Sequence, residues 1–263
     1  MCRKYVEVSR MNSAQIAKIL WESKYTVCLS GREMIVDDGI DSMRNMLSAY
    51  AIEMEYGYSP EEVFSAKFFN NRTELFYKFY REKVLAQDKE PGRAFTALAR
   101  LDQMGIVKST ITRQLYDFPR RAGCRRVFNL HGTIHERNCC PRCGRDYSLE
   151  YLRTEGKVPL CSQCRVPVHP GVRLLGEMVD IKVISQAAEE VAKADTLLLA
   201  GTNMRAEVVQ QFIRYYEGNR VIVIHEKEHF SDKEADYTVI QNVSDALTEI
   251  AEELRRMQEA QGA

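Results

Sequence analysis

The chain has 263 residues, of which 45% are hydrophobic and 28% are charged. This composition is ordinary for a globular protein, and the length allows one large core with or without a small accessory domain. The 37 basic and 37 acidic residues cancel, which argues against a protein whose main partner is nucleic acid or an anionic membrane.

The N-terminal region carries no recognisable targeting signal. Its first residues lack the apolar core of a signal peptide, and no apolar run approaches the ~20 residues that cross a bilayer. We therefore expect a cytoplasmic protein with no membrane partner, in which the eight cysteines are thiols or metal ligands.

Apolar periodicity predicts helices that alternate with short, fully apolar strands. The expected helices are 13–24, 60–87, 93–105, 182–194, 205–217 and 244–260. The expected strands are 25–31, 106–112, 124–131, 195–203 and 220–226. This alternation indicates an α/β fold with a doubly wound parallel sheet, whose ligands bind at the carboxyl ends of the strands.

Four cysteines in two CxxC pairs are the most specific motif. They are Cys140, Cys143, Cys161 and Cys164. Each CxxC turn puts two sulfurs on one side of a tight knuckle, and Gly144 relieves the first turn, so four thiolates can enclose one Zn²⁺. Because protein sulfurs fill every coordination position, the zinc should be structural. The alternative, buried or disulfide-bonded cysteines, is disfavoured by the absence of a secretory signal.

The other cysteines are not expected to be part of this site. Cys139 abuts the first pair and could compete for the metal, whereas Cys2, Cys28 and Cys124 are expected to be unligated thiols. We expect the zinc module to cover 133–168 and to be inserted in a large domain formed by 1–132 and 169–263.

The order of the motifs resembles that of the sirtuins, the Sir2 family. His131-Gly132 directly precedes the zinc module, and the segment from His169 to Glu177 after it is similar to the family's RP-x-VVFFGE segment. Gly201-Thr202-Asn203 resembles the family's GTS turn, and the strand 220–226 resembles the one whose end meets the adenosine. The resemblance runs over about residues 13–255.

This resemblance implies a Rossmann-like domain that binds NAD, with a small zinc domain beside it. It also implies an NAD-dependent enzyme that transfers the acyl group of a protein lysine to ADP-ribose and releases nicotinamide, or an ADP-ribosyltransferase of the same type. His131 takes the place of the family's base, and a neutral imidazole is suited to accept a ribose hydroxyl proton near neutral pH.

The resemblance assigns further site residues. The cofactor-binding residues would be Gly31, Arg32, Arg44, Gln114, Gly201, Thr202, Asn203 and His225. The residues that bind the substrate, an acylated lysine of a protein or peptide, would be Val172, Leu174, Gly176 and Glu177.

The expected NAD pocket departs from the family pattern in several places. Arg32 and Glu33 put long side chains where small residues let backbone N–H groups approach a diphosphate. Gln114 replaces the asparagine that contacts ribose, and Tyr116 replaces an aspartate near nicotinamide. His225 replaces an asparagine at the strand end.

Two alternatives therefore stay open. One is a catalytically degenerate sirtuin fold that binds a nucleotide, a modified peptide or a partner without turnover. The other is a zinc-ribbon protein that binds nucleic acid through a basic run. That run comprises Arg113, Arg120, Arg121, Arg125 and Arg126. A run of charges is usually a solvated face, and the net charge is zero, so nucleic acid is not the expected partner.

Overall fold

The fold is built on a seven-stranded sheet in which every strand pair is parallel. The computed structural model describes residues 9–37, 39–40, 42–43, 45–154 and 157–262. The strand order is β1-β9-β8-β7-β2-β3-β4. The bounds are β1 Ser9–Arg10, β2 Thr26–Ser30, β3 Val107–Thr112, β4 Val127–Asn129, β7 Thr196–Ala200, β8 Arg220–His225 and β9 Tyr237–Ile240. The predicted α/β class with a parallel sheet is confirmed.

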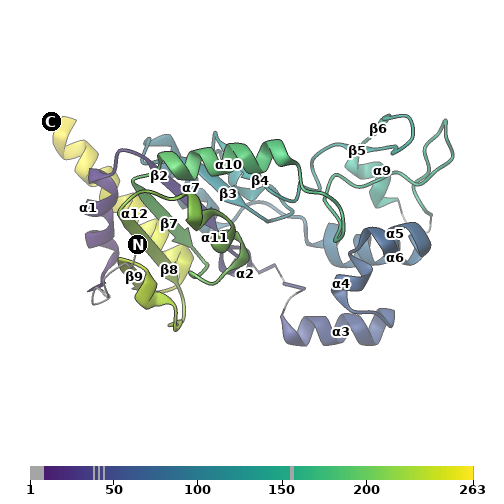
Figure 1. Cartoon of the computed structure of the whole chain (residues 1–263), viewed down its shortest axis with the longest axis horizontal. Helices are drawn as coiled ribbons and strands as arrows, with labels where there is room; N and C mark the ends of the chain where they lie inside the picture. The colour runs from purple at the N-terminus through teal and green to yellow at the C-terminus, as the bar shows by residue number, and fades with distance from the viewer. Residues whose placement is uncertain (1–8, 38, 41, 44, 155–156, 263) are drawn as a thin grey trace.

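Helices cover both faces of the sheet (Figure 1). One face packs against α1 (Ser13–Glu22), α7 (Arg93–Gln103) and α12 (Val243–Gly262). The other packs against α10 (Ile181–Lys193) and α11 (Glu207–Phe212), which is followed by the short turn η3 (Ile213–Tyr215). Successive residues of a strand point to opposite faces. Both faces are buried, so the central strands read as unbroken apolar runs.

A second group of elements lies beyond the β4 end of the sheet (Figure 1). Its helical part comprises α3 (Met46–Tyr56), α4 (Pro60–Val63), α5 (Ala66–Asn71), α6 (Thr73–Phe79), the π-helical turn η1 (Tyr80–Val84) and η2 (Leu85–Gln87). The rest is the two-stranded sheet of β5 (Asn138–Cys139) and β6 (Asp146–Tyr147), with α9 (Leu149–Arg153). The region predicted as helical over 60–87 is helical, but Ser59 and Ser65 cap new helices and divide it.

Several elements were not expected from the sequence, among them β1, β9 and α3. The strands β1 and β9 have two and four residues, which is too short for periodicity to distinguish them from loops. The helix α3 has almost no amphipathic pattern along its sequence, and its apolar residues Met46, Leu47, Tyr50 and Met54 are all exposed. The remaining short helices are α2 (Glu33–Asp37), α8 (Phe118–Arg121) and η4 (Asp232–Glu234). Over the described residues, no helix is long and apolar enough to cross a membrane.

Each arginine of the basic run is paired with an acid, although Arg120, Arg125 and Arg126 are more than half exposed. Arg125 contacts the buried Asp102 at 2.6 Å, and Arg126 contacts the buried Glu190 at 2.9 Å. The other pairs are Arg121 with Asp88, Arg120 with Asp117 and Arg113 with Glu207. These charges tie helices to the sheet edge, so the observation that motivated a nucleic-acid surface has a structural explanation.

The two groups of elements are joined at His131-Gly132. Arg173 N donates to His131 O at 2.7 Å, and Gly132 pairs with Val172 in an antiparallel bridge. Gly132 has a φ of +64°, and a Cβ on it would overlap Gly171 O. Only glycine fits both this conformation and this approach.

Gly132→Ala should therefore lower the free energy of unfolding by more than about 2 kcal/mol, because it adds a steric clash to the cost of a left-handed alanine. Gly57→Ala is the matched control, since Gly57 has a φ of +75° but nothing within 4 Å of an added Cβ. It should cost only about 1–2 kcal/mol. Urea unfolding of both variants measures the difference, and equal losses would contradict the steric explanation.

Candidate functional site

The predicted site residues gather at the carboxyl edge of the sheet, where strand ends of parallel strands meet. Gly31 follows β2, Gly201 follows β7 and Gln114 comes two residues after β3. His131 comes two residues after β4, and His225 is the last residue of β8. Of the predicted cofactor residues, Arg44 lies outside the described residues, as does the free thiol Cys2.

The turns after β2 and β7 are in direct contact. Gly31 N donates to Ala200 O at 2.8 Å, and Glu33 N donates to Gly201 O at 3.1 Å. A Cβ on Gly31 would overlap Gly201 O and Thr202 Cβ, so no larger residue fits. The close packing of the two turns therefore explains why glycine stands at 31 and at 201, independently of any ligand.

The two long side chains in the first turn take different directions. Arg32 is exposed. The Glu33 carboxylate accepts a hydrogen bond from Glu226 N at 3.0 Å, just beyond the end of β8. Its negative charge is thus engaged by a backbone donor, which reduces the repulsion of a phosphate that the sequence led us to expect.

Gln114 reaches from the end of β3 to the end of β2. Its Nε2 donates to Ser30 Oγ at 2.9 Å and to Gly31 O at 3.0 Å, and the side chain is 7% exposed. Its Oε1 is buried and has no hydrogen-bond partner among the described residues. An unpaired buried acceptor is costly, so the Gln114 amide gains by a shift that gives this oxygen a donor such as a ligand hydroxyl.

Tyr116 is part of the core. Its ring is 5% exposed and stacks on Phe118 at 5.3 Å, and its hydroxyl donates to Val84 O at 3.2 Å. Burial raises the pKa of this phenol well above its ordinary value, with the Asp88 charge adding to the effect. The side chain that replaces the family's aspartate is therefore packed in the core, against Phe118.

His131 is half-buried and is held by a charged donor. Arg113 Nε donates to His131 Nε2 at 2.7 Å, and the same guanidinium forms an ion pair with Glu207 at the start of α11. A guanidinium can only donate, so Nε2 is the acceptor and the proton of the neutral ring is on Nδ1. The sequence analysis named Arg113 only as part of a basic run, and it missed Glu207. Arg113 could have been predicted as a site residue, because it is a charged residue directly after a buried strand.

The remaining predicted cofactor residues lie at the ends of β7 and β8. Thr202 is 8% exposed, and Asn203 Oδ1 accepts from Arg205 N at 2.9 Å. His225 is 2% exposed, and its Nε2 lies 3.1 Å from Asp232 Oδ1 without the geometry of a hydrogen bond. The His225 side chain is therefore covered, whereas its carbonyl accepts from Gln241 N.

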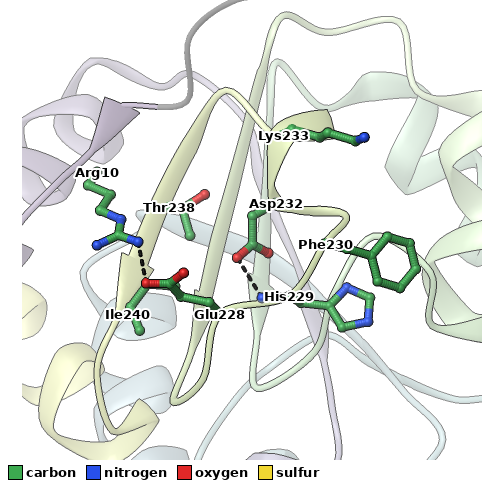
Figure 2. A pocket seen from close by; sticks show the side chains of 8 residues that line it. All are labelled: Arg10, Glu228, His229, Phe230, Asp232, Lys233, Thr238 and Ile240. Carbon is green, nitrogen blue, oxygen red and sulfur yellow. Dashed lines mark hydrogen bonds and ion pairs between the residues drawn. The ribbon is translucent and has the colours of Figure 1, made fainter.

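A pocket of about 450 Å³ lies beside this part of the sheet (Figure 2). It is formed by β1, β9 and the loop after β8. Its lining residues are Arg10, Glu228, His229, Phe230, Asp232, Lys233, Thr238 and Ile240. None of them is a predicted site residue, and Arg10 and Glu228 pair with each other across it.

The predicted substrate segment is held by isolated bridges at Val172 and Leu175 and turns at Gly176. Leu175 N donates to Phe64 O at 3.0 Å, and Ala66 N donates to Leu175 O at 2.9 Å. Val172 and Leu174 are buried. Gly176, with a φ of +90°, has open space where a Cβ would be. The Glu177 carboxylate accepts from Leu174 N at 2.8 Å and contacts His169 Nε2 at 2.7 Å, so it shapes the segment from within.

The four predicted zinc ligands are brought together. Their sulfur atoms all lie within 4.8 Å of one another, and Cys143 Sγ is 3.7 Å from Cys161 Sγ. A tetrahedral site with Zn–S bonds of about 2.3 Å requires sulfurs about 3.8 Å apart. The cluster therefore fits a structural zinc with four thiolate ligands.

The two knuckles have the same backbone geometry. Gly144 N donates to Cys140 O, and Arg165 N donates to Cys161 O, both at 2.9 Å. Gly144 and Arg165 both adopt positive φ, at 71° and 56°. The second knuckle thus forms without glycine, in a conformation that is uncommon for a long side chain.

The other described thiols are not part of this cluster. Burial raises the pKa of Cys124 to about 12 and that of Cys28 above its ordinary range, so both stay protonated and unreactive. Cys139 pairs its backbone with His169, and its sulfur is not among the four that converge.

Comparisons with known proteins agree with this arrangement. The sequence model of the Sir2 family matches residues 33–208. The NAD-dependent protein deacetylase of Clostridium acetobutylicum is 33% identical over 234 residues, which cover 89% of this chain and 95% of the relative. A crystal structure of a Sir2 homologue in complex with NAD superposes with a TM-score of 0.80 at 27% identity, covering 96% and 98% of the two chains. A Sir2 variant solved with a deacetylated peptide and 3′-O-acetyl ADP-ribose gives 0.79 at 25% identity, covering 92% and 98%.

The metal site gives a direct prediction. The purified protein should contain about one zinc per chain, and Cys143→Ser should lose it and unfold the module, because removing one thiolate leaves an open tetrahedron. Cys139→Ser is the matched control and should keep its zinc. Elemental analysis by mass spectrometry measures the metal content. Metal-free wild-type protein that stays folded would contradict a structural zinc.

The role of Tyr116 can be tested through stability. Tyr116→Phe removes the hydrogen bond to Val84 O and should lower the free energy of unfolding by about 1 kcal/mol. Tyr215→Phe changes a partly exposed phenol and should have an effect within about 0.5 kcal/mol. Thermal and urea unfolding are the measurements. An unchanged stability in Tyr116→Phe would show that the hydroxyl does not bond in the core.

Proposed function

Because the chain belongs to the Sir2 family, we propose that it removes acyl groups from protein lysines with NAD as co-substrate and His131 as the base. The observation that carries this proposal is the position of His131. It stands beyond β4 at the carboxyl edge of the sheet, and its carbonyl is bonded to Arg173 in the predicted substrate segment. The base thus lies where the expected nucleotide edge and the expected peptide strand adjoin.

The residues at the strand ends fit a nucleotide. NAD, when bound, supplies the ribose carbon that takes the acyl oxygen as nicotinamide leaves. Gly31 and Gly201 bring the turns after β2 and β7 into contact at the strand ends. Gln114 is proposed to accept a hydrogen bond from a ribose hydroxyl through its unpaired Oε1, after a shift of the amide that uncovers this buried oxygen. The exposed Arg32 is suited to pair with phosphate. We propose Thr202, Asn203 and His225 as further contacts, with His225 acting through its backbone because its side chain is covered.

The acylated lysine is proposed to bind along the segment of Val172, Leu174, Gly176 and Glu177. One edge of this segment is paired with His131 and with Phe64–Ala66. Backbone groups of alternate residues point to opposite edges. On the second edge Leu174 N and O are bonded to Glu177, so an extended peptide that pairs there would displace these contacts. The open space at Gly176 leaves that edge accessible.

In this proposal the zinc has no chemical step. Its four thiolates hold the module of 133–168 against the domain of 1–132 and 169–263, and this keeps the substrate segment in register with His131. We also propose a cytoplasmic location, because a site built from four thiolates requires reducing conditions.

The catalytically degenerate alternative is not favoured. The curated relative is a deacetylase, and structural neighbours were solved with NAD or with a deacetylated peptide and acetyl-ADP-ribose. Gln114 keeps the amide group of the asparagine that it replaces, and its carbonyl oxygen has no hydrogen-bond partner among the described residues.

Incubation with NAD and an acetyl-lysine peptide tests the proposal. The wild-type protein should release nicotinamide in step with deacetylation. His131→Ala should reduce this rate by about 10²–10⁴-fold, because the proton acceptor is gone. His229→Ala, in the pocket near β1, is the matched control and should retain the rate. No release by folded, zinc-loaded wild-type protein would refute the proposal.

A further inference from the structure

Arg113 occupies an unusual position across the carboxyl edge of the sheet. It directly follows β3, and Glu207 begins α11 after the turn that follows β7. In the strand order β7-β2-β3-β4, the end of β2 lies between these two points. The Arg113–Glu207 ion pair must therefore cross the edge at Ser30-Gly31, where the nucleotide is proposed to bind.

The same guanidinium also engages the base. Arg113 Nε donates to His131 Nε2 at 2.7 Å, so the lone pair that would accept a substrate proton is already used. Arg113 is 27% exposed and Glu207 is 66% exposed. The Arg113 side chain thus links the ends of β3 and β4 to α11. Arg113 has to release His131 and Glu207 before His131 can act on a ligand.

An ion pair of this exposure is weak enough to open. Partly exposed salt bridges contribute about 0–1 kcal/mol, since solvent screens them and ordering two long side chains costs entropy. A ligand that competes for the edge can therefore displace the link at low cost. Arginine is also suited to the double contact, because its planar fork carries donors in several directions at once.

We propose that Arg113 is a positioning residue that masks His131 in the nucleotide-free protein, with Glu207 holding it in the masking position. The masked ring is kept in one tautomer, with Nε2 as acceptor and the proton on Nδ1. Binding of a nucleotide with an ADP-ribose moiety breaks both contacts of Arg113 and exposes Nε2. This inference rests on the proposed function for the role of His131 as the base. The contact of Arg113 with His131 and its release by a nucleotide can be tested without any turnover.

The first arm of the test reads the tautomer directly. Long-range ¹H–¹⁵N spectra of the full chain resolve five histidines, and His131→Ala assigns the relevant signal. Without ligand, wild-type His131 should show a single Nδ1–H tautomer. Arg113→Met, which removes the donor at similar length, should show a mixture with the Nε2–H form. Arg255→Met, in which an equally ion-paired arginine on α12 is lost, is the matched control and should leave the signal unchanged. Identical His131 spectra in wild type and Arg113→Met would overturn the proposal.

The second arm measures binding of ADP-ribose by calorimetry. If Arg113 obstructs the edge, Arg113→Met and Glu207→Gln should each bind ADP-ribose about two- to fivefold more tightly, because the link no longer has to be broken. Weaker binding in Arg113→Met would show that Arg113 contacts the nucleotide instead of masking the base. Glu207→Gln keeps the test decisive if the arginine variant does not fold, since Glu207 is mostly exposed.

The third arm separates this inference from the proposed function. Adding ADP-ribose to the wild-type protein should convert the His131 signal to the pattern of Arg113→Met. An unchanged tautomer at saturating ADP-ribose would refute the masking while leaving deacylation intact. Loss of nicotinamide release with a normal tautomer shift would instead refute the deacylase and leave the masking standing.

Discussion

The contact between the turns after β2 and β7 is the constraint on which the site depends. These turns can approach only because Gly31 has no Cβ, and their backbones are joined by hydrogen bonds from Gly31 to Ala200 and from Glu33 to Gly201. The approach closes the carboxyl edge between β2 and β7, and β3 and β4 are aligned beside it by their pairing with β2 and with each other. Gln114, Arg113 and His131 follow the ends of these strands, so the strand pairing brings them to one edge.

The substituted residues of the nucleotide edge are accommodated by contacts within the protein. Glu33 binds a backbone N–H beyond β8, Gln114 binds the end of β2, and Tyr116 joins the aromatic layer. Each replacement is thereby removed from the space of a ligand or given a partner. Gln114 Oε1 and His225 Nε2 are exceptions, because both are buried without a hydrogen-bond partner among the described residues. A site under selection only for stability would gain by satisfying such an atom, which is why we connect Gln114 Oε1 with ligand binding.

The charged residues explain why a neutral chain can have a strongly basic segment. The arginines that follow β3 and precede β4 are paired with acids on α7, α10 and α11 and in loops, including Asp88 just after η2. Two of these acids, Asp102 and Glu190, are fully buried, and a buried carboxylate requires a cationic partner. The basic run is thus a set of structural ties, with one member, Arg113, positioned at the carboxyl edge of the sheet beside His131.

The sequence by itself determined the fold class, the cluster of four cysteines and the place of His131 beyond a strand end. Fully apolar strands, CxxC spacing and the order of motifs can be recognised along the chain without knowing which segments meet in space. Short elements such as β1 and β9 were missed because two or four residues carry no period. Only the tertiary structure decided how the altered residues are used. Which strands are neighbours decides where these side chains go. It brings Gln114 to the end of β2, puts Tyr116 in the core and lets Arg113 reach both His131 and Glu207. The order β7-β2-β3-β4 pairs Thr26 with Thr196, 170 positions away, and brings Arg113 to Glu207, 94 positions away. No spacing along the chain encodes that adjacency.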